Sequence, residues 1–336
     1  MSQPAAAPTP LLAQRLVFDG KQQVRLEATA LPVPQAGEVR IASEYSLMST
    51  GTENIVFNRL FDAGTGWDNW VKYPFFPGYS LVGRIDAVGP DVTAFTIGQR
   101  VTARKPHGSH HLARTDEIVA VPERLDPKLA AWFALAKITY GGCRVAEFHV
   151  GDSALVIGAG PIGQMSLRWA FASGVRDLIV VDALESRLQL ARAGGATITI
   201  AAPIEQAKER IQAALGGRLP RVVIDTTGNA AVFAHATTLA ADRGRIVIVG
   251  DTGSPTNQHL TGDVLGRGLS IVAAHDTHWP GNPESIVGMC FDLALSGRFP
   301  LDGLNTHSFK PAAAAEAYHI ANTKRGETMG ILFDWT

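Results

Sequence analysis

The chain has 336 residues, of which 46% are hydrophobic and 18% charged, with a formal net charge of -1 at pH 7. This length exceeds what one ordinary core accommodates, so two domains are expected. The near-neutral charge argues against a nucleic-acid partner, which requires a clustered excess of Lys and Arg. No apolar stretch is long enough to cross a bilayer, and residues 1–16 lack the pattern of a secretory signal.

The chain contains two cysteines, Cys143 and Cys290, which lie far apart in sequence. Two cysteines form neither a disulfide framework nor a four-thiolate zinc site. We therefore expect a cytoplasmic protein whose partner is a small-molecule substrate rather than a nucleic acid or a membrane.

The first third of the chain is rich in segments of β type separated by turns. Gly and Pro residues punctuate these segments, a pattern that favours a partly open β-barrel over a parallel sheet. The expected strands are Val24–Ala28, Glu38–Ser43, Leu81–Val88, Arg100–Arg104 and Glu117–Val121.

The pattern changes after about Pro127, where short apolar strands begin to alternate with segments of helical length. These strands are rich in Val and Ile, as parallel strands covered on both faces should be. A doubly wound α/β domain is therefore expected after the barrel. The expected elements are a helix at Lys128–Ala136, strands at Ala154–Ile157, Leu178–Val181, Val222–Asp225 and Ile246–Val249, and a tail with a helix at Pro311–Asn322 and an apolar run at Met329–Trp335.

The strongest motif lies between the first of these strands and an apolar helix. It reads Gly158-Ala159-Gly160-Pro161-Ile162-Gly163. The first glycine permits a tight turn, the second lets the backbone approach a pyrophosphate, and the third allows close packing of the helix. The N-terminus of that helix supplies oriented N–H groups to the anion. This arrangement predicts a dinucleotide site.

An acidic residue at the end of the second strand indicates which dinucleotide binds. Asp182 follows Gly158 by 24 residues, near the spacing at which a carboxylate accepts the adenosine ribose hydroxyls. The same carboxylate would repel a 2′-phosphate, so NAD is predicted over NADP. Arg187 could tolerate a phosphate, but its position five residues later places it more naturally along the ribose.

The motifs together resemble those of the medium-chain dehydrogenase/reductase superfamily. Besides the glycine motif, the order and spacing of Phe76–Ile85, Val88–Pro90 and Gly98–Val101 follow the N-terminal barrel of that family. The resemblance implies a GroES-like catalytic domain at residues 1–137, completed by 285–336, and a Rossmann domain at residues 138–284. It also implies an active site in the interdomain cleft and a dimer or tetramer, with a homodimer expected.

The zinc ligands of that family are replaced in this chain. Where zinc members carry Gly-His-Glu, this chain has Gly78-Tyr79-Ser80. It has Thr50 where they carry a cysteine, and Leu135 stands near the place of a further Cys or Asp. These side chains do not supply the ligands that zinc requires. Residues 102–117, where the structural zinc lobe should follow, contain no cysteine, so no metal is expected. The run Ser49–Glu53 resembles the zinc-free branch that includes bacteriochlorophyllide hydroxyethyl dehydrogenase, without implying that substrate.

Without zinc, a side chain must accept or donate the proton of the substrate. By resemblance, Thr52 aligns with a proton-relaying hydroxyl, Glu53 with an acid behind the metal site, and Tyr79 with a metal-binding histidine. Tyr79 could touch substrate or merely fill the vacated volume, and Glu53 could instead form a structural ion pair. A histidine in the run 107–111 could act as general base, because the ordinary pKa of histidine is near neutrality, and His110 is the preferred candidate; a solvated turn is the alternative.

Further residues are assigned to the nicotinamide cofactor and to a possible substrate pocket. The resemblance places a set of residues along the nicotinamide and its ribose, with the last two approaching the carboxamide: Thr139, Val249, Gly250, Ala273 and His275. Trp67 and Trp70 could line a substrate pocket or anchor a long loop.

These observations lead to one main functional prediction and two alternatives. The main prediction is NAD(H)-dependent, zinc-independent hydride transfer between nicotinamide and a secondary alcohol or ketone such as a polyol, a sugar or another hydroxylated metabolite. The first alternative is an NADPH-dependent quinone or enoyl reductase, which Asp182 disfavours. The second is a sensor that binds NAD(H) without turnover.

Overall fold

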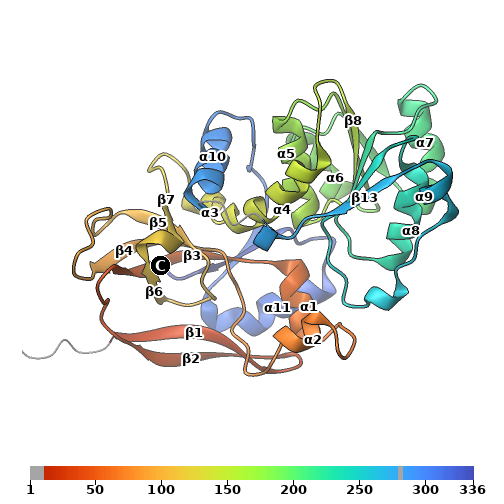
Figure 1. The fold of residues 1–336 in the computed structure, drawn as a ribbon. Coiled ribbons are helices and arrows are strands. Elements are labelled where there is room, and N and C mark those ends of the chain that lie inside the picture. The colour runs from red at the N-terminus through yellow and green to blue at the C-terminus, as the bar shows by residue number, and fades with distance from the viewer. Residues whose placement is uncertain (1–10, 279–282) are drawn as a thin grey trace, which may run out of the picture.

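The computed structural model of the chain describes residues 11–278 and 283–336. Figure 1 shows two lobes, one built largely from the N-terminal strands and one from the middle of the chain. The C-terminal segment, in blue, returns to the first lobe. The architecture is therefore a GroES-like β domain joined to a Rossmann domain.

The catalytic domain is formed mainly by β-strands from both ends of the chain. One sheet has the order β14-β15-β3-β4-β5-β7, with β6 paired to β3, and a separate hairpin is formed by β1 and β2. The strands are β1 (Leu11–Gly20), β2 (Gln23–Leu31), β3 (Glu38–Met48), β4 (Leu81–Val88), β5 (Arg100–Ala103), β6 (His110–Arg114), β7 (Ile118–Ala120), β14 (Asn305–Phe309) and β15 (Gly330–Asp334). The helices of this lobe are α1 (Thr50–Asn58), α2 (Gly66–Trp70), α3 (Pro127–Ala130) and α11 (Ala314–Thr323).

The Rossmann domain is a six-stranded parallel sheet with the order β10-β9-β8-β11-β12-β13. The order reverses between β8 and β11, and in sheets of this kind ligands bind at that switch point. Its strands are β8 (Ser153–Ile157), β9 (Asp177–Asp182), β10 (Ile198–Ala201), β11 (Val222–Asp225), β12 (Arg245–Ile248) and β13 (Ser270–Ala273). Its helices are α5 (Pro161–Ala172), α6 (Glu185–Ala193), α7 (Lys208–Ala214), α8 (Ala230–Leu239) and α9 (Gly262–Gly266).

Two helices cross the domain boundaries expected from the sequence. Helix α4 (Phe133–Ala146) contains the boundary at residues 137 and 138, and α10 (Pro283–Leu295) contains the one at 284 and 285. A buried cluster that includes Trp132, Trp169 and Phe299 packs around these helices. The two lobes therefore share a core where the chain passes between them.

The C-terminal tail completes the catalytic sheet. Strand β15 pairs antiparallel with β3, with Ile331 opposite Met48, and parallel with β14. Its side chains Ile331, Leu332 and Phe333 are at most 1% exposed. The apolar run at the end of the sequence is thus a central strand.

Several elements were absent from the sequence-based expectation. Strand β1 and helices α1 and α2 were not predicted, and β6 occupies part of the run that was considered as a turn. Helix α1 has a weak apolar pattern because it buries polar residues, among them Glu53 and Asn54. Within the described residues, no helix is long and apolar enough to cross a membrane.

Replacing Leu332 with alanine tests the contribution of the C-terminal strand to stability. The side chain is 1% exposed and packs in the cluster around α4 and α10. We expect Leu332→Ala to lower the free energy of unfolding by about 2–5 kcal/mol, the usual cost of such a cavity. Urea denaturation followed by circular dichroism measures it. Leu265→Ala, at a 91% exposed position of α9, is the matched control and should change little.

Candidate active site

The glycine motif forms the turn between β8 and α5. Gly158 has φ of +86°, and Gly160 caps α5, whose first residue is Pro161. A Cβ at Gly163 would lie 1.9 Å from the carbonyl oxygen of Gly158, so only glycine permits this packing. Ile162 packs against the shared core. The free N–H groups at the start of α5 therefore face the switch point of the sheet, where a pyrophosphate fits.

Asp182 ends β9 beside this turn. Its Oδ2 accepts a hydrogen bond from the Ala159 N–H at 2.7 Å, and its Oδ1 accepts one from the Leu184 N–H at 2.8 Å. Each carboxylate oxygen keeps a lone pair for a further donor. Arg187 Nη1 lies 3.8 Å from Asp182 Oδ2, and its Nη2 donates to the Arg325 carbonyl. The carboxylate is thus held at the place where a ribose would bind.

The residues assigned to the nicotinamide side lie on two different parts of the fold. Thr139 is buried in α4 and donates to the Leu135 and Ala136 carbonyls. Val249 and Gly250 follow β12, where both N–H groups donate to the Asp225 carbonyl.

Two further assigned residues stand near the end of β13. Ala273 is exposed, and His275 is exposed with its Nδ1 2.8 Å from Thr277 Oγ1.

A buried carboxylate lies inside the catalytic lobe. Glu53 is 2% exposed, and its Oε1 accepts from the Ser49 N–H at 2.7 Å. Its Oε2 lies 3.1 Å from His107 Nε2 and accepts from the Tyr318 hydroxyl at 2.5 Å. Three donors from separate parts of the chain therefore compensate for the desolvation of this carboxylate.

His107 is wholly buried, and its second ring nitrogen also has a partner. Nδ1 lies 2.7 Å from Ser46 Oγ, which accepts a hydrogen bond from Trp335 Nε1 at 2.9 Å. The Ser46 hydroxyl has one proton and two lone pairs, so beside Trp335 it can pair with Nδ1, while the Nε2–H of the ring faces the Glu53 carboxylate. The ring also packs against Gly78, where a Cβ would lie 2.7 Å from it.

Tyr79 presents a chain of hydroxyl groups above this buried network. Its phenol donates to Ser49 Oγ at 2.5 Å and lies 3.4 Å from Thr52 Oγ1. Burial raises the pKa of Tyr79, while the hydrogen bonds with Ser49 and Thr52 oppose the rise. The phenol therefore remains protonated near neutral pH and suits the role of a proton donor.

The positions of the family's zinc ligands carry groups with other roles. The Ser80 hydroxyl donates to the Ala131 carbonyl at 2.5 Å, and Leu135 is a buried aliphatic side chain. The Tyr79 phenol is hydrogen-bonded to Ser49, and Thr50 is the first residue of α1. In the part of the chain that the structure describes, no three His, Cys, Asp or Glu side chains are grouped to hold a metal. These residues do not fit zinc.

His110 lies on another surface of the barrel. Its Nδ1 is 3.1 Å from Ser109 Oγ, and its Nε2 is 3.8 Å from Asp86 Oδ2. Burial lowers the pKa of His110, which Asp86 partly opposes. No contact found among residues 11–278 and 283–336 joins His110 to Tyr79. The structure instead brings the neighbouring His107 into the site.

The two tryptophans considered for a substrate pocket belong to an aromatic cluster. Trp67 stacks on Phe61, with centroids 6.5 Å apart, and lies 5.6 Å from Trp70. Trp70 in turn meets Phe75 edge to face. This packing anchors the loop around α2 to the barrel.

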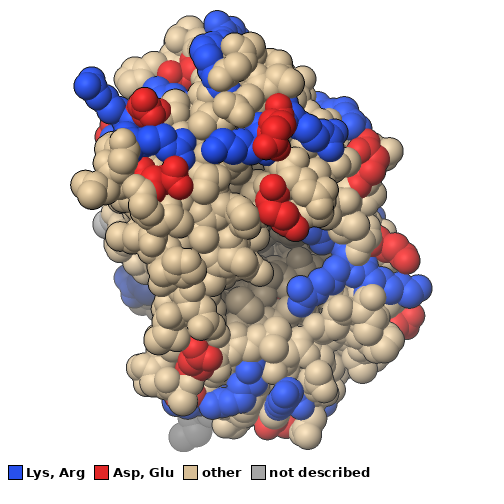
Figure 2. Space-filling view, turned by 90° about the vertical axis from the view of Figure 1, so that its right-hand side faces the viewer, with Lys and Arg blue, Asp and Glu red and all other residues tan. Residues whose placement is uncertain are grey.

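The two lobes meet through polar contacts beside Tyr79. Arg104, just after β5, pairs with Asp276, which follows β13, and its guanidinium lies over the Tyr79 ring with 5.1 Å between Cζ and the centroid. A second contact joins Asp62 to Ser254, with 3.1 Å between Oδ1 and Oγ. Figure 2 shows a hollow at the height where the lobes join, with Lys and Arg side chains along one side. Tyr79 thus stands where both lobes can contact a substrate.

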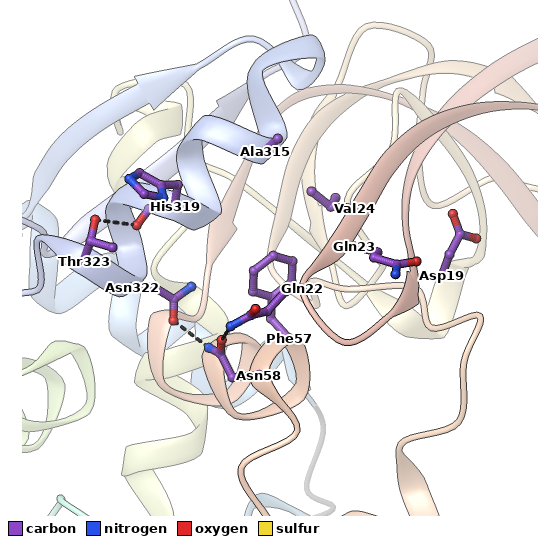
Figure 3. A pocket seen from close by; sticks show the side chains of 10 residues that line it. All are labelled: Asp19, Gln22, Gln23, Val24, Phe57, Asn58, Ala315, His319, Asn322 and Thr323. Atoms are coloured by element: carbon purple, nitrogen blue, oxygen red, sulfur yellow. Dashed lines mark hydrogen bonds between the residues drawn. The ribbon is translucent and has the colours of Figure 1, made fainter.

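A separate pocket opens between the β1–β2 hairpin, α1 and α11 (Figure 3). Its amide side chains bind one another: Gln22 donates to Asn58, and Asn58 donates to Asn322. Phe57, which lines it, stacks on Tyr318 with 5.0 Å between centroids. The polar groups here support the packing of α11, whose Tyr318 reaches Glu53.

Comparison with known proteins identifies the family. Residues 35–125 match the family described as alcohol dehydrogenase GroES-like domain, and residues 161–278 match zinc-binding dehydrogenase. L-threonine 3-dehydrogenase of Symbiobacterium thermophilum is 32% identical over 61% of this chain and 68% of its own length. The chain belongs to the medium-chain dehydrogenase/reductase superfamily. It is an alcohol dehydrogenase-like enzyme.

Other relatives agree with this assignment. L-threonine 3-dehydrogenase of Bacillus subtilis is 25% identical over 82% of this chain and 88% of its own. An Escherichia coli oxidoreductase of unknown specificity has the same fold, with a TM-score of 0.84 at 20% identity over 96% of this chain and 99% of its own. An Escherichia coli alcohol dehydrogenase crystallised with NADH has a TM-score of 0.79 at 20% identity over the same shares. Another neighbour, from Sinorhizobium meliloti, was crystallised with NADP, so the fold does not select the cofactor.

Several site residues were missed by the sequence analysis. His107 was passed over for His110 because nothing in the run of histidines shows which one is buried. Tyr318 lies 265 residues from Glu53, and Asp276 lies 172 residues from Arg104. Contacts of this range have no local signal in one sequence.

The buried tyrosine at Glu53 predicts a loss of stability in alkali. Burial and the neighbouring Glu53 raise the pKa of Tyr318 well above its ordinary value. The folded chain therefore keeps this proton where the unfolded chain, with a tyrosine pKa of about 10, releases it. Stability should hold below about pH 10 and fall as the pH rises further.

Thermal melts from pH 8 to 11 would measure this effect. Tyr318→Phe should make the melting temperature fall less steeply above pH 10, although the variant loses a hydrogen bond at all pH values. Tyr140→Phe, at a tyrosine outside the network, is the control. If the melting temperature of Tyr318→Phe fell with pH as steeply as that of the wild type, Tyr318 would not be the group whose deprotonation destabilises the fold.

Proposed function

We propose that the enzyme is an NAD(H)-dependent, zinc-independent oxidoreductase that interconverts a secondary alcohol and a ketone. The chain of hydroxyls from Tyr79 to Ser49 and Thr52, at a position where zinc members hold their metal, is the observation that carries this proposal. Hydroxylated metabolites such as polyols and sugars are the expected substrates, and named relatives act on L-threonine. We further propose a cytoplasmic homodimer.

The nicotinamide, when bound, accepts or donates the hydride, and the side chains transfer the proton. In ketone reduction, the Tyr79 phenol donates its proton to the substrate oxygen as negative charge develops there. Ser49 or Thr52 then relays a proton to the phenol oxygen, and the partly exposed Thr52 hydroxyl takes the replacement proton from solvent, which is also where the proton leaves in oxidation. In oxidation the same transfers run backwards, so the substrate hydroxyl proton reaches Tyr79 while Tyr79 passes its own to Ser49.

Glu53 is a positioning residue in this scheme. Its carboxylate holds the N–H of Ser49, whose hydroxyl accepts from Tyr79. His107 and Tyr318 fix the other carboxylate oxygen. The buried network therefore sets the direction in which the Tyr79 phenol points, without contacting the substrate.

Asp182 supports the choice of NAD. The carboxylate is fixed by two backbone N–H groups, so it cannot turn away from a 2′-phosphate without losing both. Arg187, the cation that could offset such a phosphate, is held by Asp182 itself and by the Arg325 carbonyl.

Replacement of Tyr79 tests the proton transfer. We expect Tyr79→Phe to lower kcat by about 10²–10⁴-fold, the usual contribution of a positioned acid or base, with NADH affinity nearly unchanged. Turnover is measured from nicotinamide absorbance across a panel of secondary alcohols and ketones, and affinity from NADH fluorescence. His110→Ala is the matched control and should keep near-normal kcat. Near-normal turnover of Tyr79→Phe would remove the phenol from the mechanism.

Cofactor preference is tested by titration of the two reduced coenzymes. We expect NADH to bind about 10- to 100-fold more tightly than NADPH, because the Asp182 carboxylate repels the 2′-phosphate of NADPH. Each factor of ten corresponds to about 1.4 kcal/mol of binding free energy. Asp182→Ala should narrow this gap. Equal affinities in the wild-type enzyme would overturn the assignment and favour an NADPH-dependent quinone or enoyl reductase.

Elemental analysis tests the independence from zinc. The purified enzyme should contain no stoichiometric zinc, and chelation should leave its turnover unchanged, because Tyr79, Ser80 and Leu135 offer no adequate ligand set. A full equivalent of zinc that is lost together with activity would contradict this. NADH binding without turnover of any panel compound would instead identify a non-catalytic sensor.

A further inference from the structure

Three charged side chains from different elements gather around Arg104, whose guanidinium lies over the Tyr79 ring. Arg104 follows β5, Lys137 lies on α4, and Asp276 follows β13. Arg104 pairs with Asp276 and covers the Tyr79 ring. Helix α4, which carries Lys137, packs against the turn Asp276–His278, and this places the ammonium group within electrostatic range of Asp276 and Arg104. The cluster therefore borders the hydroxyl at which the proposed reaction occurs.

The cluster has more positive than negative charge. Asp276 is its one carboxylate among the residues described, and burial alone would raise the pKa of Asp276, but Arg104, His275 and Lys137 together lower it. Asp276 therefore carries its charge at neutral pH. The two cations Arg104 and Lys137 together exceed it by one charge.

The hydrogen-bond donors of the two cations are largely unused. Arg104 offers five N–H groups, of which one nitrogen binds Asp276. Within residues 11–278 and 283–336, Lys137 has neither a hydrogen bond nor an ion pair, although burial lowers its pKa. Lys137 is half-buried, so an acceptor for its ammonium group would offset the part of its hydration that burial removes. A role in holding the lobes together explains the Arg104–Asp276 pair but not Lys137.

We propose that Arg104 and Lys137 bind an anionic oxyacid group, a carboxylate or a phosphate, of the substrate whose hydroxyl or ketone oxygen meets Tyr79. This inference rests on the proposed function and narrows its substrate to a small hydroxy acid or a phosphorylated alcohol. Asp276 acts as an internal counter-ion that competes with the substrate anion for Arg104. Because the guanidinium lies over the Tyr79 ring, only a few bonds separate the anionic group from the reacting oxygen.

Binding to the NADH-loaded enzyme tests the inference without turnover, because NADH cannot react with an alcohol. Isothermal titration calorimetry compares 3-hydroxybutyrate with its neutral methyl ester, and glycerol 1-phosphate with glycerol. We expect at least one anion to bind about tenfold or more tightly than its neutral twin, as charge-assisted hydrogen bonds would give. The two pairs distinguish a carboxylate from a phosphate.

Variants of the cluster make the test specific. Arg104→Gln and Lys137→Gln should each reduce the anion-to-neutral preference about tenfold or more, and Arg104→Lys should retain part of it. Asp276→Asn should strengthen anion binding several-fold, because the competing carboxylate is lost. Arg114→Gln, at an exposed arginine on β6, is the control. NADH affinity and circular dichroism confirm that each variant folds.

The outcomes separate this inference from the proposed function. Equal binding of anions and neutral twins, no binding of either anion, or weaker anion binding in Asp276→Asn would overturn the anion site. Turnover of neutral secondary alcohols would then still support the proposed function. Anion binding that depends on Arg104 and Lys137, without any turnover of a panel compound, would support the site and overturn the function.

Discussion

The fold of the catalytic lobe depends on one buried negative charge. Glu53 is withdrawn from water, and a carboxylate in that position is tolerated only when donors surround it. Its donors come from the start of α1, from the segment before β6 and from α11. These three segments must therefore reach their final places together. Removal of one donor would leave the charge only partly compensated.

The same network supports the proposed reaction without the metal of the family. In zinc members a Lewis acid stabilises the oxygen of the substrate. Here that space holds a phenol whose position is fixed by Ser49, and Ser49 is fixed by Glu53. In the proposed mechanism a buried acid, Glu53, therefore lies behind the hydroxyl groups that would transfer the proton.

Sequence reasoning found those parts of the molecule whose signals are local. The turn at Gly158–Gly163 and Asp182 were recognised because turn geometry and helix packing restrict the residue type at each position. The fold class followed from the change between β-type and alternating segments. His107 and Tyr318 were not recognised, since their roles arise from burial against Glu53 and not from their neighbours in sequence. Arg104 and Lys137 look like ordinary surface charges until Asp276 is placed beside them.

Strand β15, at the end of the chain, affects the order in which the two lobes fold. Strand β15 lies between β14 and β3, so the N-terminal sheet receives a central strand from the last residues of the chain. During synthesis on the ribosome, the edge of β3 that pairs with β15 stays unpaired until the whole Rossmann domain has been made. The Rossmann domain has no such dependence, because its six strands are consecutive. We expect the middle of the chain to fold first and the catalytic lobe to close last, since pairings of long sequence separation form slowly.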